Sequence, residues 1–417
     1  MQLFSWIFLA ALLATLAIKL WLARRQLATV AANRARVPQE FAEKVALSAH
    51  QKAADYTLAK TRLGRWELGV DALLVLAITL GGGLDLIDRA VRSISAAGLV
   101  HDLLLIGTLA VVTGIVELPF SIYRTFIVEA RFGFNRMTVG LVIADLGKQL
   151  LLGALIGVPL IAAVLWMMGA LGSLWWLYAW VFWMVVNVLM IAIFPTWIAP
   201  LFNKFSPLTN EELKTRIESL LARCGFKSQG LFVMDGSKRS SHGNAYFTGF
   251  GKSKRIVFFD TLIERLQPTE IEAVLAHELG HFKRRHIMKR IVLSFLLSFG
   301  LFALLGWLID KPWFYNGLGV SYPGNGMALI LFFAALPAFT FILQPISSML
   351  SRRHEFEADQ YAAQQTQAGD LVSALVKLYQ DNASTLTPDP IYSAIYDSHP
   401  PAAIRIAHLK QSAGLVA

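Results

Sequence analysis

The sequence predicts a mainly helical membrane protein, because it is strongly apolar, carries few charges and contains several long apolar stretches. Of its 417 residues, 55% are hydrophobic and 16% are charged, whereas about a quarter of the residues in soluble globular proteins are charged. The mean hydropathy is +0.53. The chain has one cysteine, Cys224, which excludes an intramolecular disulfide and a cysteine-based metal cluster.

Seven apolar stretches are long enough, or nearly so, to cross a bilayer of about 30 Å. They are residues 3–23, 68–87, 99–122, 150–168, 174–196, 287–309 and 327–350. The first is a retained membrane helix rather than a signal peptide, because no basic residue precedes Lys19 and no small-residue cleavage pattern follows. The second is interrupted by Asp71 and by glycines 81–83, and the third carries Glu117. Intramembrane carboxylates of this kind usually face a cavity or a partner.

The distribution of basic residues predicts the orientation of these stretches. If residues 24–67 are cytoplasmic and the connecting segments alternate, all but four of the 38 Lys and Arg residues fall on the cytoplasmic side or its helix flanks. The four exceptions are Lys19, Arg89, Arg92 and Lys311. This pattern places the N-terminus outside and the C-terminus inside. It also explains the net charge of +10 without a nucleic-acid partner.

These stretches divide the chain into four regions. Residues 1–200 hold five membrane helices and their loops, 201–286 form a polar region, 287–350 hold two membrane helices, and 351–417 form a second polar region. In the first polar region, residues 210–223 have the pattern of an amphipathic helix. Residues 231–234, 244–250 and 255–259 have the pattern of strands.

The most informative motif is His277-Glu278-Leu279-Gly280-His281. A helix is expected from about Pro268, with Thr269 and Glu272 as a capping box. Two histidines four residues apart lie one turn apart on the same face of a helix. They can therefore share one Zn²⁺, and Glu278 can act as the general base on a water bound to that ion. The three fixed positions of the motif make a chance match uncommon.

A hydrolytic zinc site needs a third protein ligand and an open position for water. The segment Glu355-Phe356-Glu357-Ala358-Asp359 is the best candidate, because its helix begins where the seventh apolar stretch ends and could fold back against the motif helix. Glu355 and Asp359 are four residues apart on one helix face, so one could bind the ion while the other orients a zinc-bound imidazole. Spacing alone leaves the ligand open between Glu355 and Glu357.

Together these two motifs resemble the integral-membrane zinc CAAX prenyl endopeptidases. The resemblance extends over nearly the whole chain and over the order of the seven apolar stretches. Its other matching segments are residues 126–135 (Phe-Ile-Val-Glu-Ala-Arg-Phe-Gly-Phe-Asn), 244–250 (Asn-Ala-Tyr-Phe-Thr-Gly-Phe) and 398–401 (Ser-His-Pro-Pro).

The resemblance implies one Zn²⁺ per chain held by His277, His281 and Glu355, with Glu278 activating water and Asp359 supporting a histidine. It further implies that Asn244 and His399 contact the substrate backbone or the developing oxyanion, and that Arg405 is a further polar residue of the site. It also implies a fold in which seven transmembrane helices enclose a water-filled chamber, beneath a cytoplasmic zinc protease domain of the gluzincin type. The roles of His242 and His286 stay open.

The expected function is zinc-dependent cleavage of a peptide or protein substrate, with or without a lipid, by an enzyme embedded in membrane lipid. The preferred substrate is a C-terminal CAAX-type prenylated peptide. The alternatives are a membrane protease of broad specificity for quality control, and a transporter whose zinc is structural. The host membrane would be a bacterial inner membrane or the endoplasmic reticulum, depending on the source.

Overall fold

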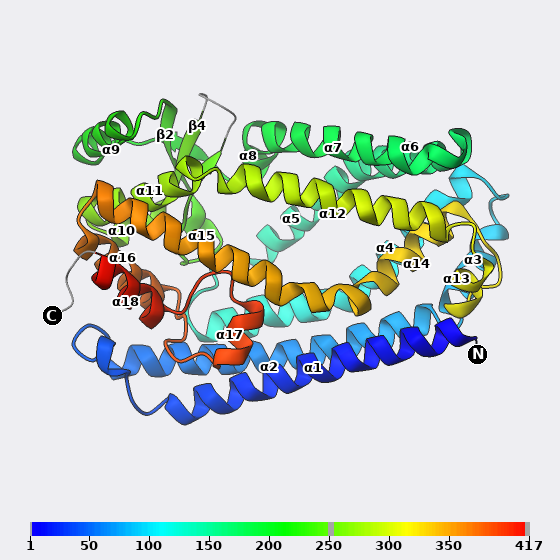
Figure 1. Cartoon of the computed structure of the whole chain (residues 1–417), viewed down its shortest axis with the longest axis horizontal. Helices are drawn as coiled ribbons and strands as arrows, with labels where there is room; N and C mark the ends of the chain where they lie inside the picture. Colours follow the sequence, from blue (N-terminus) through cyan, green and yellow to red (C-terminus); the bar gives the residue numbers. More distant parts are fainter. Residues whose placement is uncertain (1, 249–253, 413–417) are drawn as a thin grey trace.

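The computed structural model describes residues 2–248 and 254–412, and its longest helices run along the long axis of the molecule (Figure 1). Within the described residues, six helical segments are long and apolar enough to cross a membrane. They are Leu3–Asn33 (α1), Leu99–Glu129 (α4 and its continuation), Val139–Ala170 (α5 and α6), Gly172–Phe202 (α7 and its flanks), His286–Leu308 (α12) and Asn325–Gln365 (α14 and α15). A seventh span is formed if the bent pair Leu47–Ile78 (α2) and Gly83–Arg92 (α3) is taken as one. The predicted mainly helical membrane architecture is confirmed.

The bend between α2 and α3 is 54° and lies in the middle of the second predicted stretch. Gly82 has φ +76°, a conformation that side chains with a Cβ adopt only at a cost. A Cβ on Gly83 would lie 2.6 Å from the carbonyl oxygen of Ala77, and one on Gly81 would lie 2.9 Å from it. The three glycines that interrupt the apolar pattern therefore allow the chain to turn sharply here.

The predicted packing of the helix that carries Glu355 against the motif helix is confirmed, but the chain does not reverse direction to reach it. Residues 341–343 form a single tight turn between α14 (Asn325–Thr340) and α15 (Gln344–Gln365), and the two helices form one span without a sharp bend. Pro345 sits at the start of α15, where its missing N–H removes no helical hydrogen bond. The helix that carries Glu355 is thus an extension of the membrane helix, and α11 packs against that extension.

A small sheet lies beside these helices, with the strand order β1-β2-β4-β3. The strands β2 (Ser228–Met234), β3 (Ala245–Thr248) and β4 (Lys254–Phe259) were predicted, whereas the short strand β1 (Phe205–Pro207) was not. The central pair β2 and β4 is parallel, and β1 and β3 are antiparallel edge strands. Residues 249 and 250, which the prediction included in the third strand, lie outside the described residues.

The two polar regions, which are far apart in the sequence, fold together around one core. Buried side chains of α9 (Glu211–Cys224), β4, α11 (Pro268–Lys283), α16 (Ala368–Asp381) and α18 (Ala402–Ser412) pack in a single cluster that includes Ile217, Phe258, Leu275, Leu375 and Ile406. Asn210 caps α9 by accepting a hydrogen bond from the backbone N–H of Leu213. The remaining helices are α8 (Ala199–Phe202), α10 (Asp260–Arg265), α13 (Pro312–Gly317) and α17 (Pro390–Tyr396).

The capping box of α11 lies two residues earlier than predicted. Gln267 is the N-cap, and its backbone N–H donates to Glu270 Oε2 at 2.7 Å. Pro268 occupies the first helical position, which proline favours. Glu270 also accepts hydrogen bonds from Ser373 and Lys377, so the start of α11 is fixed to α16 as well.

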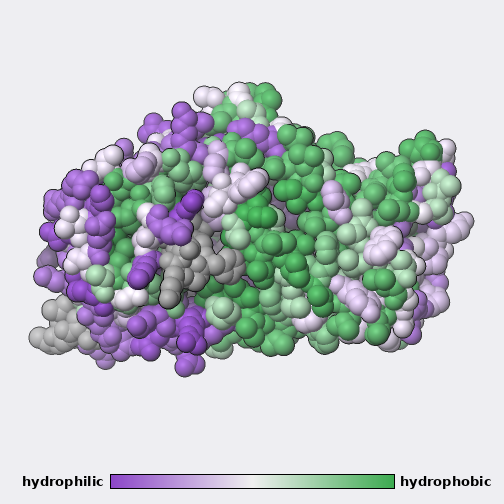
Figure 2. Space-filling view, turned by 90° about the horizontal axis from the view of Figure 1, so that it is seen from above, coloured by the Kyte–Doolittle hydropathy of each residue, from purple (hydrophilic) through white to green (hydrophobic). Residues whose placement is uncertain are grey.

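The surface separates into two parts along the long axis. In Figure 2, hydrophobic residues dominate the part formed by the membrane helices, and hydrophilic residues gather at the end that carries the sheet and the last helices. The N-terminus and the end of the described chain lie at opposite ends of the molecule (Figure 1). This separation is what a chain with one membrane-embedded part and one water-exposed part requires.

Candidate metal centre

The two helices that carry the sequence motifs approach each other unusually closely. A Cβ on Gly280 of α11 would lie 2.9 Å from the Cα of Ala358 and 3.0 Å from its carbonyl oxygen on α15. Real Cβ atoms essentially never come that close to another backbone. The glycine within the His-Glu-x-x-His motif and the small residue between Glu357 and Asp359 therefore allow the contact that brings Glu355 to the histidines.

Three side chains converge at this contact. His277 Nε2 and His281 Nε2 are 3.2 Å apart, and they lie 3.5 Å and 3.4 Å from the two oxygens of Glu355. One ligand atom from each residue lies within 4.8 Å of the others. This is the only such group of metal-binding side chains among residues 2–248 and 254–412.

These residues fit a zinc ion by geometry and by charge. Ligand atoms placed at about 2.1 Å from one tetrahedral ion are roughly 3.4 Å apart, which is close to the observed separations. The carboxylates of Glu355 and Asp359 are both buried, and the neighbouring buried cation is Arg405. A second positive charge would balance the remaining carboxylate, because an uncompensated buried charge is strongly unfavourable.

His277 is supported from behind by an acid and a guanidinium. Its Nδ1 lies 2.8 Å from Asp359 Oδ1, and Arg405 donates to both oxygens of Asp359 at 2.6 and 2.7 Å. Burial and Arg405 lower the pKa of His277, but the hydrogen bonds to Asp359 and Glu355 outweigh them and raise it to about 9. The pocket thus stabilises positive charge, as a cation site must.

His281 has a different support. Its Nδ1 lies 3.0 Å from Nδ1 of His286, and His286 Nε2 lies 3.0 Å from Glu357 Oε2. His286 is the first residue of α12 and is 1% exposed. The carboxylate of Glu357 is therefore engaged with His286, whereas the carboxylate of Glu355 lies among the converging atoms.

The sequence left the role of His286 open because its contact depends on the chain turn between α11 and α12. Arg285 has φ 56°, in the left-handed region that non-glycine residues rarely adopt. This turn brings His286 back against His281, five residues earlier. A sequence pattern does not report such a dihedral angle, although a histidine this close to the motif could have been considered as a supporting residue.

Glu278 is half-buried on α11, next to His277. Its carboxylate forms no hydrogen bond or ion pair with any residue in the described part of the chain. It therefore differs from Glu355 and Asp359, which are held in fixed contacts. A carboxylate without protein partners beside a metal cluster is free to bind water or substrate.

The remaining predicted site residues are placed differently from one another. His399 is exposed, and its Nδ1 lies 2.7 Å from Glu355 Oε2. Arg405 is buried and bound to Asp359, so its guanidinium is not presented to solvent.

Asn244 is exposed just before β3, and its side chain accepts a hydrogen bond from the backbone N–H of Ala245. Phe247 of β3 packs against Phe282 of α11 at 5.1 Å, which places this strand beside the motif helix.

His242, the other histidine without an assigned role, lies outside this cluster. It contacts Asn382 at 3.1 Å and Glu129 at 3.6 Å, and it stacks on Phe134. Glu129 and Phe134 belong to the segment 126–135 that the resemblance singled out. His242 therefore joins that segment to the loop after α16.

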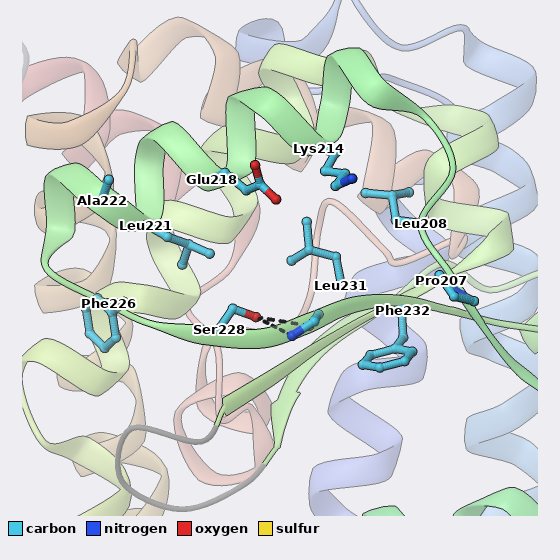
Figure 3. A pocket seen from close by; sticks show the side chains of 11 residues that line it. Pro207, Leu208, Lys214, Glu218, Leu221, Ala222, Phe226, Ser228, Leu231 and Phe232 are labelled. Atoms are coloured by element: carbon cyan, nitrogen blue, oxygen red, sulfur yellow. Dashed lines mark hydrogen bonds between the residues drawn. The ribbon is translucent and has the colours of Figure 1, made fainter.

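Several cavities lie in the molecule. One of about 660 Å³ is lined by Asp71, Glu67 and Glu129, and an adjoining one of about 460 Å³ is lined by Asp71 and Glu117. The two membrane carboxylates thus face cavities, as expected from their cost in lipid. Another cavity, of about 450 Å³, has α9 residues such as Glu218 on one side and β2 residues such as Leu231 on the other (Figure 3). None of the converging metal-binding residues lines it.

Comparison with known proteins agrees with this arrangement. Residues 26–204 match the family described as CAAX prenyl protease N-terminal, five membrane helices, and residues 207–413 match peptidase family M48. The chain belongs to the CAAX prenyl protease 1 family of M48 zinc metallopeptidases. The predicted family, its enzymatic class and its integral-membrane character are therefore confirmed, and the transporter alternative is disfavoured.

Individual relatives cover most of the chain. CAAX prenyl protease 1 of Saccharomyces cerevisiae is 39% identical over 74% of this chain and 72% of its own length. The Homo sapiens CAAX prenyl protease 1 homolog is 32% identical over 97% of this chain and 95% of its own length. A crystal structure of S. mikatae Ste24p superposes with a TM-score of 0.91 at 34% identity and covers 98% of this chain and 99% of that one.

Proposed function

We propose that this protease uses one Zn²⁺, held by His277, His281 and Glu355, to cleave C-terminal CAAX-type prenylated peptides at the membrane. The single observation that carries this proposal is the convergence of these three ligand atoms, with Glu278 next to His277 on α11 and without a partner among the described residues. The names of the relatives support the substrate class.

A zinc ion bound here would polarise the scissile carbonyl and lower the pKa of the attacking water. Glu278 would serve as the general base and then as the proton donor to the leaving amine, because its carboxylate has no competing partner among the described residues. Asp359 holds His277 through Nδ1, which leaves Nε2 for the ion.

His399 and Asn244 are proposed to contact the substrate backbone or the developing oxyanion, because both are exposed near the motif helices. A donor that stabilises an oxyanion commonly contributes about 3 kcal/mol. We assign Arg405 a positioning role rather than contact with the oxyanion, because it is 6% exposed and both its Nε and one terminal nitrogen are bound to Asp359.

The proposed topology places residues 201–286 and 351–417 on the cytoplasmic side and the N-terminus outside. Its support is the excess of Lys and Arg at the end of the molecule that carries the metal centre. The N-terminus lies at the opposite end (Figure 1).

The test uses the full chain reconstituted in lipid, with a farnesylated CAAX peptide and the same peptide without the farnesyl group. We expect about one zinc per chain by elemental analysis and faster cleavage of the farnesylated peptide. Glu278→Gln should retain zinc and lower kcat by about 10²–10⁴-fold, the usual contribution of a general base.

Three outcomes would change the proposal. Wild-type activity in Glu278→Gln would remove this residue from the mechanism. Cleavage by the wild-type chain after zinc has been removed would show that the mechanism does not need the metal. Equal cleavage of both peptides would replace the prenyl-directed function with broad membrane proteolysis.

A further inference from the structure

We infer that His286, held by Glu357, is the positioning residue that fixes the ring of His281 so that its Nε2 faces the metal. This inference rests on the proposed zinc function. It assigns a role to a buried histidine that neither sequence motif contains. The observation behind it is the continuous contact chain from Glu357 through His286 to His281, with two steps of 3.0 Å.

The contacts determine which ring atoms carry hydrogens. An ionised carboxylate only accepts hydrogen bonds, so His286 must donate to Glu357 through its Nε2–H. A neutral His286 then has a lone pair on Nδ1 and accepts from the Nδ1–H of His281. With its hydrogen on Nδ1, His281 has a free lone pair on Nε2, the atom that faces His277 and Glu355.

The ring plane of His286 is also fixed by packing. His354, one residue before Glu355, stacks on it with centroids 4.0 Å apart and an interplanar angle of 13°. His281 and Glu357 therefore hold the ring of His286 on two edges, and His354 holds it on one face. Because His354 and Glu357 flank Glu355 on α15, the same helix supplies a metal ligand and the support of another ligand.

The backbone points to the same role. Arg285 adopts a left-handed conformation, with φ 56°, that is unfavourable for a residue with a Cβ. Such strain persists only where the surrounding structure holds it in place, and it gathers at functional sites. Here its consequence is that the first side chain of α12 lies against the last ligand of α11.

The arrangement is the counterpart of the support of His277. That histidine uses Nδ1 for Asp359 and leaves Nε2 for the centre. His281 does the same, with an imidazole in place of the carboxylate and with Glu357 one step further out. Loss of such an outer partner typically lowers metal affinity about 10–100-fold.

Two substitutions of His286 separate hydrogen bonding from packing. His286→Phe keeps an aromatic ring against His354 but has no acceptor for His281. His286→Asn loses the ring, but its Oδ1 stands at the same distance from Cβ as Nδ1 of histidine and accepts a hydrogen bond. Arg353→Gln is the matched control, because Arg353 contacts the other oxygen of Glu357 at 3.4 Å and is largely exposed.

The measurement is the rate at which purified full-length protein in detergent loses zinc to an excess of chelator, with zinc content determined first. We expect His286→Phe to lose zinc about 10–100-fold faster than wild type. His286→Asn should lie closer to wild type than His286→Phe, and Arg353→Gln should match wild type. Glu357→Leu, at a half-buried position, is expected to accelerate zinc loss as well and serves if His286→Phe does not fold.

A wild-type rate of zinc loss in both His286→Phe and Glu357→Leu would overturn the inference. So would a result in which His286→Phe retains zinc better than His286→Asn, since packing would then be what matters. Absence of zinc from the wild-type chain would instead refute the proposed zinc function, so the two failures are distinguishable.

Discussion

Two buried histidine–carboxylate clusters lie at opposite ends of the molecule and use their ring nitrogens differently. At the α11 end, His277 and His281 each use Nδ1 for a supporting group and turn Nε2 toward a common centre. At the α3 end, His101 has its Nε2 3.1 Å from Asp88 and its Nδ1 3.5 Å from Asp102. Figure 1 shows the separation of the two ends.

The difference lies in geometry rather than in composition or burial. Asp88 and His101 are as buried as Glu355 and His277. Asp88, however, is paired with Arg92 at 2.6 Å, and the ring of His101 lies between two carboxylates instead of pointing with other ligands at one site. We call this second group, Asp88, Arg92, His101 and Asp102, the polar lock, because it joins α3 to α4. Ring nitrogens that converge distinguish a metal site from a charge-paired cluster.

The largest expected effect separates the two clusters by metal content. Glu355→Ala removes one of three ligands and leaves two imidazoles, so we expect loss of zinc and of cleavage. Asp88→Asn, the matched change in the polar lock, should retain one zinc per chain. Elemental analysis of both purified variants is the measurement. Full zinc in Glu355→Ala would shift the third ligand to another side chain, with Glu357 the first to examine.

The next effect concerns the close approach that each cluster requires. A Cβ on Gly280 would meet the backbone of Ala358 at 2.9 Å, and one on Gly326 would meet Cβ of Asp102 at 2.9 Å. Gly280→Ala should push α15 away from α11, lower stability by about 1–3 kcal/mol and weaken zinc binding roughly tenfold. Gly326→Ala should lower stability alone. Thermal unfolding and chelator competition on both variants are the measurements. Equal zinc affinity in Gly280→Ala and Gly326→Ala would show that zinc binding tolerates a wider spacing of α11 and α15.

The polar lock itself should affect stability without affecting chemistry. Asp88→Asn removes the charge that His101 and Arg92 share, and the loss of a buried hydrogen-bonded charge costs about 1–3 kcal/mol. We expect a lower Tm by tryptophan fluorescence and an unchanged kcat for the zinc-loaded protein. Asp85→Asn is a suitable control, because Asp85 is a more exposed acid on the same helix that binds Ser321. A kcat that falls with Asp88→Asn would instead couple this end of the molecule to the metal centre.

The parts of this structure that local patterns encode were predictable from the sequence. The apolar stretches, the helix of the His-Glu-x-x-His motif and the three longer strands follow from hydrophobic periodicity. The pairing of the two histidines follows from helical spacing. Even within this class, the capping box was misplaced, because Gln267 with Glu270 forms the box in place of Thr269 with Glu272.

The parts that depend on long-range contacts were not predictable in the same way. Spacing could not choose between Glu355 and Glu357, because the choice is made where α15 meets α11 at Gly280. The packing of α15 on α11 was expected, but the sequence did not show that α15 reaches α11 by continuing from α14 without a sharp bend. Burial of Arg405 against Asp359 joins residues 46 positions apart and likewise has no local signature.

The smallest expected effect tests whether the turn at Arg285 matters for its shape or for its side chain. Arg285→Gly keeps the left-handed conformation without the Cβ penalty, so the rate of zinc loss should not change. Tm should rise by about 1–2 °C, because the relief of strain in the folded state is partly offset by a more flexible unfolded chain. Arg285→Ala keeps the strain and removes only the guanidinium, and it should match wild type in both measurements. If Arg285→Gly loses zinc faster than Arg285→Ala, then a rigid turn, and not merely a turn of the right shape, holds His286 against His281. The metal centre would then depend on backbone stiffness in a way that the polar lock, built on regular helices, does not.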